Sequence, residues 1–229
     1  MTDEAALAAL TAEVVACRRC PRLVEWRERV AREKVKRFRD ETYWGLPVPG
    51  FGDPDARVLI VGLAPAAHGG NRTGRVFTGD ASGDFLFPQL HAVGFSNQAT
   101  SRRADDTLAL TDAYVAAAVR CAPPDNKPLP TERDACAPYL ARELALLDGV
   151  RVIVALGAYA WESAFRAIAS VTDYDARPRP GFGHGAEAVA GRYRIVASYH
   201  PSQQNTLTGR LTASMLRDVL ARARIVAGG

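Results

Sequence analysis

One stretch of sequence sets the architecture of this chain: the apolar run RVLIVG at residues 57–62, followed by the glycine-rich loop LAPAAHGG at residues 63–70. A short, continuous apolar run is typical of a strand that is buried on both faces of a parallel sheet. Three similar runs occur at residues 113–120, 150–156 and 193–198. We therefore expect residues 57–62 to be one of four central strands.

Helical patterns fill the intervals between these runs. They lie at about residues 83–93, 132–147 and 158–169, with further patterns at 4–16, 18–39 and 208–226. Strand–helix alternation at this spacing favours an α/β fold, with a mostly parallel sheet and helices on both sides. Pro138 is expected to kink its helix or to reset its start. Residues 41–55 are rich in Gly and Pro and are expected to form a long loop.

Composition is that of a globular protein without membrane segments. The 229 residues are 48% hydrophobic and 24% charged, which excludes a disordered chain or a coiled coil. No apolar run approaches the ~20 residues that span a bilayer, and the N-terminus lacks the basic and apolar regions of a secretory signal. No repeat or domain boundary is visible. We expect one domain over residues 1–229, in a cytoplasmic, nucleoid-associated protein that does not bind membranes.

Positive charge is concentrated near the N-terminus. The chain has 29 basic and 25 acidic side chains, a net charge of +4, and residues 18–39 carry ten Arg or Lys against three Glu. This stretch is expected to be a helix with a strongly basic face. Such a face is either an ordinary solvated surface or a surface that follows nucleic-acid phosphates, and charge alone leaves both interpretations open.

The four cysteines are Cys17, Cys20, Cys121 and Cys136. In a reducing cytosol such a set more often holds a metal than forms disulfides. Cys17 and Cys20 form a C-x-x-C pair, whereas the wider spacing of the other two does not fit a zinc ribbon. Four thiolates from three chain segments could hold a [4Fe–4S] cluster or a structural Zn²⁺, and spacing does not distinguish them. The alternative is four unrelated buried thiols.

The loops that follow the expected strands should carry the chemistry, because ligands of open parallel sheets bind at the carboxyl ends of the strands. The first loop matches neither the P-loop nor the dinucleotide-binding pattern. No G-x-S-x-G or H-E-x-x-H sequence occurs, which disfavours a serine hydrolase or a zinc protease. The loops do contain an aromatic residue, carboxylates, amides and a His-Pro-Ser turn, which suit binding a flat polar ring and activating a water.

Three motifs resemble those of a known enzyme family. The run GLAPAAHGGNRTG at residues 62–74, leading into FTGD at residues 77–80, resembles the first motif of the family 5, or type B, uracil-DNA glycosylases. HPSQQN at residues 200–205 resembles the second motif of the wider superfamily, and RCAPPDNKP at residues 120–128 also matches. The resemblance covers about residues 17–224.

This resemblance implies a three-layer α/β/α sandwich around a four-stranded parallel sheet. It implies a structural [4Fe–4S] cluster on the four cysteines, with the helical segment 4–39 contributing to the site. It also implies a monofunctional, monomeric DNA repair glycosylase that flips uracil, hypoxanthine, xanthine or ethenocytosine out of double-stranded DNA. Hydrolysis of the N-glycosidic bond would leave an abasic site.

The catalytic roles follow from the chemistry of that bond, since positive charge builds on the sugar and negative charge on the departing base. Asp80 is expected to stabilise the cation and orient water, with Asp84 as a competitor and a plain helix N-terminal acid as the alternative. His200 is expected to donate an N–H to the base oxygen. Asn126 is expected to contact the base or the water.

The expected base pocket is apolar. Phe77 should stack on the extruded base, while Gly62 and Ala64 line the pocket and the Ser202 turn offers backbone N–H groups to a phosphate. Ala117 stands where the related type A enzymes have an Asn that reads uracil, and Leu63 where they have a Glu. Loss of such a hydrogen-bond filter should broaden base specificity.

Five residues are expected to contact DNA outside the base pocket. Arg72 and Arg75 should meet phosphates, and Gln203, Gln204 and Asn205 should lie near the minor groove and hold the duplex open. Two other functions remain possible from the sequence. One is an iron–sulfur or zinc module that binds nucleic acid without catalysis, and the other is a hydrolase of free nucleotides or nucleosides.

Overall fold

The computed structural model describes residues 4–175 and 178–228, and a single six-stranded sheet forms its centre. The strands are β1 (Phe51–Gly52), β2 (Val58–Gly62), β3 (Ala113–Ala117), β4 (Val152–Leu156), β5 (Glu187–Ala190) and β6 (Tyr193–Ser198). Their order is β1-β3-β2-β4-β6-β5. The four inner strands are parallel, as the apolar runs predict.

The two edge strands were not expected, and both run antiparallel to their neighbours. β1 has only two residues and lies within the Gly- and Pro-rich segment expected to be a loop. β5 alternates exposed positions with more buried ones, so one of its faces is open to solvent. Neither strand is buried on both faces, and so neither produces a continuous apolar run. The prediction of a central four-stranded parallel sheet is therefore correct, and the structure adds one antiparallel strand at each edge.

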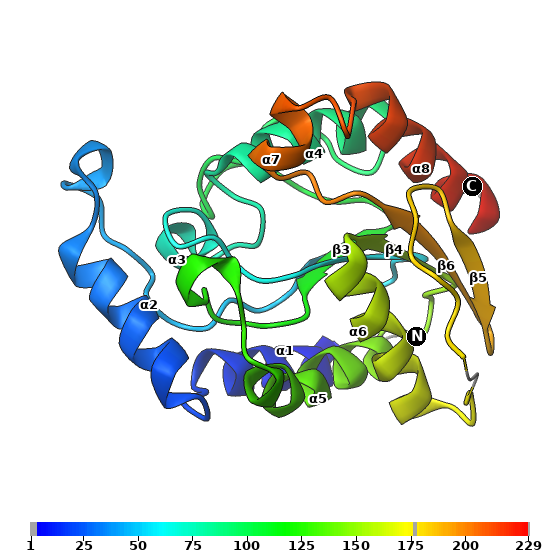
Figure 1. Cartoon of the computed structure of the whole chain (residues 1–229), viewed down its shortest axis with the longest axis horizontal. Coiled ribbons are helices and arrows are strands. Elements are labelled where there is room, and N and C mark those ends of the chain that lie inside the picture. Colours follow the sequence, from blue (N-terminus) through cyan, green and yellow to red (C-terminus); the bar gives the residue numbers. More distant parts are fainter. Residues whose placement is uncertain (1–3, 176–177, 229) are drawn as a thin grey trace.

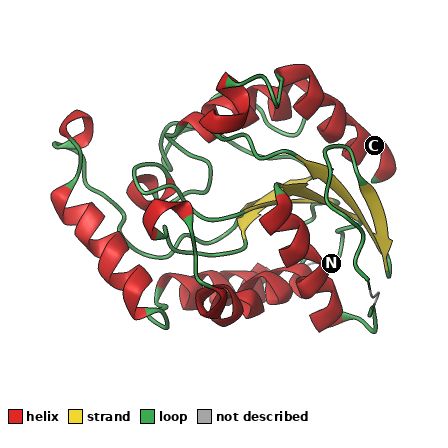
Figure 2. Ribbon diagram, in the orientation of Figure 1, coloured by secondary structure: helices red, strands yellow, loops and turns green. Residues whose placement is uncertain are grey.

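Helices cover both faces of the sheet (Figures 1 and 2). Their bounds are α1 (Glu4–Val15), α2 (Pro21–Glu33), η1 (Lys36–Phe38), α3 (Gly70–Thr73), α4 (Ala81–Ala92), η2 (Pro124–Asn126), α5 (Pro130–Leu146), α6 (Ala158–Val171), α7 (Gln203–Leu207) and α8 (Ala213–Val226). In Figure 1, α1, α5 and α6 lie below the sheet, and α4, α7 and α8 lie above it. None of the helices in the described ranges has the length and apolar character needed to cross a membrane.

Two helical predictions were wrong in their extent. The basic stretch 18–39 is not one helix, because α2 ends at Glu33 and Lys34 adopts a φ of +55°. The pattern at 208–226 starts too early, because Gly209 has a φ of +72° and separates α7 from α8. In contrast, α5 runs through Pro138 and starts with Pro130 in its first turn, where proline costs no hydrogen bond.

The core has one apolar layer on each face of the sheet. Leu59 and Val61 of β2 face the layer that contains Trp161 and Phe165 of α6. Val58 and Ile60 of the same strand face the opposite layer, which contains the aromatic and aliphatic side chains of α4 and α8. All residues of β2 are buried, so the strand ends that carry the site loops are held from both sides.

Candidate active site at the carboxyl ends of the strands

A cavity of about 1390 Å³ opens where the loops after β2, β3 and β6 converge. Ala66–Gly69 follow β2, Asn126 follows β3 and Gln203 follows β6, and all of them line it. The remaining walls come from the start of α4, from the segment after α2 and from the loop at residues 99–105. The cavity therefore lies at the carboxyl ends of the strands, where the topology of the sheet predicts a ligand site.

Asp80 lies in the wall of this cavity and is also the N-cap of α4. Its Oδ1 accepts a hydrogen bond from the backbone N–H of Gly83 at 2.9 Å. Burial raises the pKa of Asp80, and Asp84 adds to this, while the N–H groups at the helix start and the nearby Arg72 act in the opposite direction. Asp80 is therefore a helix N-terminal acid that also lines the cavity, and its catalytic role stays a prediction.

Gly69 makes the position of Asp80 possible. A Cβ at Gly69 would lie 2.7 Å from Cβ and Cγ of Asp80, and closer still to its Oδ2. Any side chain at this position would displace the carboxyl group. The glycine-rich loop after β2 is therefore shaped around the carboxylate. The competing Asp84 is exposed on the first turn of α4 and lines the same cavity.

Phe77 and His200 come together from different strand ends. Their ring centroids are 5.9 Å apart, at an interplanar angle of 39°. The Phe77 ring packs over Gly62, where a Cβ would lie 2.6 Å from Cζ of the ring. Neither ring is among the described residues that line the large cavity, although Asp80 and Gln203, each three residues further along the chain, both line it.

His200 is an uncharged group at neutral pH. Burial lowers its pKa to about 4, so the imidazole has one N–H donor and one acceptor nitrogen. Its backbone is held by Asn205, whose side-chain amide donates to the His200 carbonyl at 2.9 Å. Asn205 therefore stabilises the turn after β6, which the sequence did not indicate.

The other predicted base-pocket residues lie in different parts of the structure. Ala117 ends β3, is fully buried and pairs in register with Gly62 at the end of β2. Ser202 is the N-cap position of α7. Ala64 packs against the apolar cluster that surrounds the cysteines. Exposed Asn126, with a φ of +55°, lies at the cavity. Their roles toward a base stay predictions.

The expected surface position of Arg72 is wrong, because its side chain is only 6% exposed. Its guanidinium donates to the carbonyls of His68 and Gly79 and pairs with Glu41, while its plane lies over the Phe38 ring. Arg72 lines the cavity, but all three of its nitrogens are already bound within the protein. It stabilises the walls and is not free to bind a phosphate.

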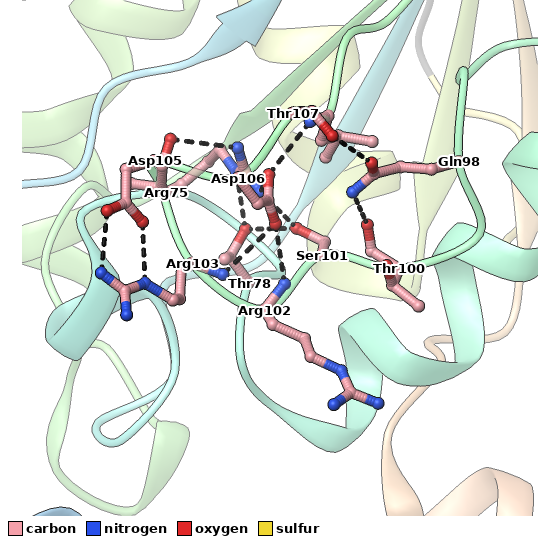
Figure 3. A network of polar contacts seen from close by, with 12 residues as sticks. Arg75, Thr78, Gln98, Thr100, Ser101, Arg102, Arg103, Asp105, Asp106 and Thr107 are labelled. Atoms are coloured by element: carbon pink, nitrogen blue, oxygen red, sulfur yellow. Dashed lines mark hydrogen bonds and ion pairs between the residues drawn. The ribbon is translucent and has the colours of Figure 1, made fainter.

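Arg75 is buried as well, so its expected surface position is also wrong. Figure 3 shows it at the centre of a polar network, with hydrogen bonds to Thr78, Ser101 and Asp106. Its Nη2 is 2.7 Å from Oδ1 of Asp106. A local sequence pattern cannot distinguish such an arginine from an exposed one, because two of these partners, Ser101 and Asp106, lie more than 20 residues away. Gln203 and Gln204, in contrast, are exposed at the start of α7, as expected.

The four cysteines gather at one small cavity, separate from the large one. They come from the α1–α2 connection, from the end of the β3 segment and from α5, and pack with Leu10, Val14, Leu23 and Tyr139. Across the described parts of the chain, no three His, Cys, Asp or Glu side chains form a group that could hold a single metal ion.

Two donors already point at the thiol sulfurs. Nη1 of the buried Arg27 is 3.2 Å from Sγ of Cys121, and the backbone N–H of Arg120 is 3.2 Å from Sγ of Cys136. Burial raises the pKa of Cys121 to about 12 and that of Cys136 to about 11. Buried thiols with N–H donors and a guanidinium beside them fit the ligand shell of a group that binds thiolates.

Sequence reasoning missed a histidine that lines the cavity. His68 lines the cavity, and its Nδ1 is 3.1 Å from the hydroxyl of the buried Tyr43. Burial, Arg37 and Arg72 lower the pKa of His68. The histidine stands in the glycine-rich loop, but nothing in the sequence near Tyr43 indicated that the two residues meet.

The chain is similar to known glycosylases over most of its length. The model of the uracil DNA glycosylase superfamily matches residues 49–224. A type-5 uracil-DNA glycosylase of Thermus thermophilus is 54% identical over 216 residues, which cover 94% of this chain and 95% of that protein. One of Mycobacterium bovis is 52% identical over 222 residues, or 96% of this chain and 81% of that protein. A type-4 uracil-DNA glycosylase of Archaeoglobus fulgidus is 29% identical over 156 residues, or 68% and 70%.

Proposed function

This chain belongs to the uracil DNA glycosylase superfamily, and on that premise we propose that it excises uracil, and other deaminated or modified bases, from double-stranded DNA. It is a hydrolytic DNA glycosylase. In the proposed reaction the bond between the sugar C1′ and the base nitrogen breaks, the base leaves with the electron pair, and water supplies the oxygen that bonds to C1′. The product is an abasic site.

The observation that carries the proposal is the fixed Asp80 carboxylate in the cavity wall. A carboxylate beside C1′ stabilises the positive charge of the sugar and accepts a proton from the attacking water. Because its pKa is raised, the Asp80 carboxylate is a stronger base than an ordinary aspartate and accepts a proton more readily near neutral pH. Asn126 lines the same cavity and would hold the water or the base.

His200 and Phe77 would act on the base. A neutral imidazole N–H can donate a hydrogen bond to a base oxygen and stabilise the negative charge that develops there. Phe77 offers a ring face for stacking, which contributes ~1–3 kcal/mol per base and accepts different ring systems. Extrusion itself costs a few kcal/mol and least for mispaired bases, which favours deaminated bases as substrates.

Relaxed base specificity is the finer part of the proposal. Gly62 and Ala117 end neighbouring, register-paired strands and contribute no side-chain hydrogen bond. A pocket with a bidentate amide rejects a wrong base because the amide is then left without hydrogen-bond partners. A pocket without such an amide lacks this penalty and therefore accepts more bases. Hypoxanthine, xanthine and ethenocytosine are therefore proposed as further substrates, to be ranked by excision from duplexes that carry each base opposite each partner.

We also propose that Cys17, Cys20, Cys121 and Cys136 hold a [4Fe–4S] cluster. When bound, the group supplies a cross-link between the N-terminal segment, β3 and α5, and it takes no part in base removal. The observations that support it are the shared cavity and the Arg27 and Arg120 donors. Iron and sulfide analysis with a visible spectrum tests this, and a colourless protein with stoichiometric zinc would contradict it.

The test of function is release of free uracil from a duplex, a single strand and a nucleoside by the monomeric protein. Asp80→Asn is expected to remove most activity. Asp84→Asn is the matched control, because the same change is made on the same cavity but at an exposed carboxylate one helical turn away. Equal activity of both variants and the wild type would contradict the role of Asp80. Release from the nucleoside alone would instead indicate a small-molecule hydrolase.

A further inference from the structure

Arg102 lines the same cavity, and no group of residues 4–175 and 178–228 pairs with its guanidinium. We propose that it binds a DNA phosphate next to the nucleotide whose base is removed, and that the loop at residues 98–107 holds it in place for this contact. The inference rests on the proposed function, in which the cavity receives a nucleotide of DNA.

The arginines that line the cavity differ in what already binds them. They are Arg37, Arg72, Arg102 and Arg103. Arg72 and Arg103 each pair with a carboxylate of their own wall, and Arg37 lies over an aromatic ring at 4.4 Å. Within residues 4–175 and 178–228, the Arg102 guanidinium has no hydrogen bond, ion pair or ring contact. Figure 3 shows its side chain extending away from the network that holds its backbone.

The backbone at Arg102 is held firmly although its side chain is free. The Asp106 carboxylate accepts the Arg102 N–H at 3.0 Å and Nη2 of Arg75 at 2.7 Å. Ser101 is fully buried, and its carbonyl accepts the N–H of Gly79 at 2.8 Å. A loop that is ordered before binding loses less conformational entropy when it meets its ligand, so it can present a charged side chain at low cost.

The hydrogen bond from the Gly79 N–H to the Ser101 carbonyl places Arg102 close to Asp80. Gly79 directly precedes Asp80, and a Cβ at Gly79 would lie 2.9 Å from the Arg102 carbonyl oxygen. If Asp80 acts at a sugar, the phosphates joined to that sugar are the nearest anions that the substrate brings.

The charge of the cavity walls favours a free cation where a DNA strand binds. Its walls also carry the carboxylates of Asp40, Asp80 and Asp84, which repel a phosphate. Arg72 and Arg103 cannot offset them, because their charges are already paired with carboxylates. Arg102 adds a positive charge where the strand must pass. The partner of Arg102 is therefore the backbone of the damaged strand.

The first experiment measures binding to a duplex that contains a tetrahydrofuran abasic-site analogue, which the enzyme cannot cleave. Dissociation constants are compared between about 50 and 200 mM salt for the wild type, Arg102→Gln and Arg103→Gln. The two variants lose the same formal charge from the same loop. Arg102→Gln is expected to weaken binding about tenfold at the low-salt end and to reduce the slope of log K against log salt by about 0.9. Arg103→Gln should change neither, because Asp105 already neutralises that side chain.

The second experiment locates the phosphate. A neutral methylphosphonate replaces the phosphate on either side of the analogue, one at a time. One of the two is expected to weaken binding of the wild type but not of Arg102→Gln, since both changes remove the same contact. Equal losses in the two arginine variants, or additive losses at both phosphates, would overturn the proposal. Binding here requires no base release, so a wild type that fails to excise uracil would refute the proposed function without affecting this result.

Discussion

Replacing Gly69 with alanine should test the active site most sharply, because it moves the proposed catalytic carboxylate without changing its chemistry. The new Cβ would lie 2.7 Å from Cβ and Cγ of Asp80, whereas ordinary contact begins at 3.4 Å. The Asp80 side chain must therefore move by at least about 0.7 Å, and its Oδ2, which is closer, by more. A misplacement of about 1 Å can reduce a catalysed rate about 100-fold.

The assay is single-turnover excision of uracil from a duplex at saturating enzyme. Gly69→Ala is expected to lower the rate constant about 100-fold, with a loss of stability of ~1–3 kcal/mol, as is usual for overpacking. Gly181→Ala is the control, since a Cβ there meets nothing within 4 Å. The same loss of rate should be absent when Asp80→Asn is already present, because both changes disable one group. A folded Gly69→Ala protein with the wild-type rate would refute the assignment of Asp80.

Four further predictions concern other parts of the molecule. Because burial lowers the pKa of His200 to about 4, its neutral form adds stability above its unfolded pKa of about 6.5, and this stability is lost as the pH falls toward 4. His200→Gln should flatten the pH dependence of the unfolding free energy between these values, and an unchanged profile would exclude the effect. Arg120→Met leaves the buried Glu143 without its ion-pair partner and should lower the free energy of unfolding in urea by about 3–5 kcal/mol. The double variant Arg120→Met/Glu143→Met should recover much of this loss. Full additivity of the two single changes would contradict the prediction. Cys136→Ala should abolish the iron content measured per chain and lower the melting temperature, and retained iron would argue against this ligand. Ala117→Asn should increase discrimination between uracil and hypoxanthine in competitive excision by about 10- to 200-fold, the range of a modest pocket contact; an unchanged ratio would place Ala117 outside the base pocket.

The central strands could be predicted because their signal is local. β2 and β6 are apolar at nearly every position, since helices cover both faces of the sheet, and each strand can be recognised without knowing its neighbours. The edge strands β1 and β5 lack that property, because their existence depends on a neighbour that supplies the hydrogen bonds.

The position of the active-site loops could be predicted from the topology of the sheet, and Asp80 and His200 could be identified from motifs. The contacts that surround these two residues could not be predicted. That Gly69 makes room for the Asp80 carboxyl is a contact between residues eleven positions apart, on different elements. The pairing of Phe77 with His200 joins residues more than one hundred positions apart.

The arginines show that local sequence does not determine whether a charged side chain is bound within the protein. Arg72, Arg75 and Arg102 all stand in polar, loop-like sequence, and Arg72 and Arg75 were expected to meet DNA. The structure buries these two among carbonyls and carboxylates, whereas in the described part of the chain no group pairs with the Arg102 guanidinium. A side chain is available for a ligand only when no partner of its own chain reaches it, and that depends on the whole fold.

The sequence by itself therefore determined the α/β class, the four inner strands and the end of the sheet at which the cavity opens. Apolar periodicity and short motifs report burial and chemistry one segment at a time, and those properties belong to each segment. Only the tertiary structure decided which arginines are bound internally, how the cysteines meet at one cavity and where the Asp80 carboxyl is held. Each of these depends on distances between segments that lie far apart along the chain, and such distances exist only once the chain has folded.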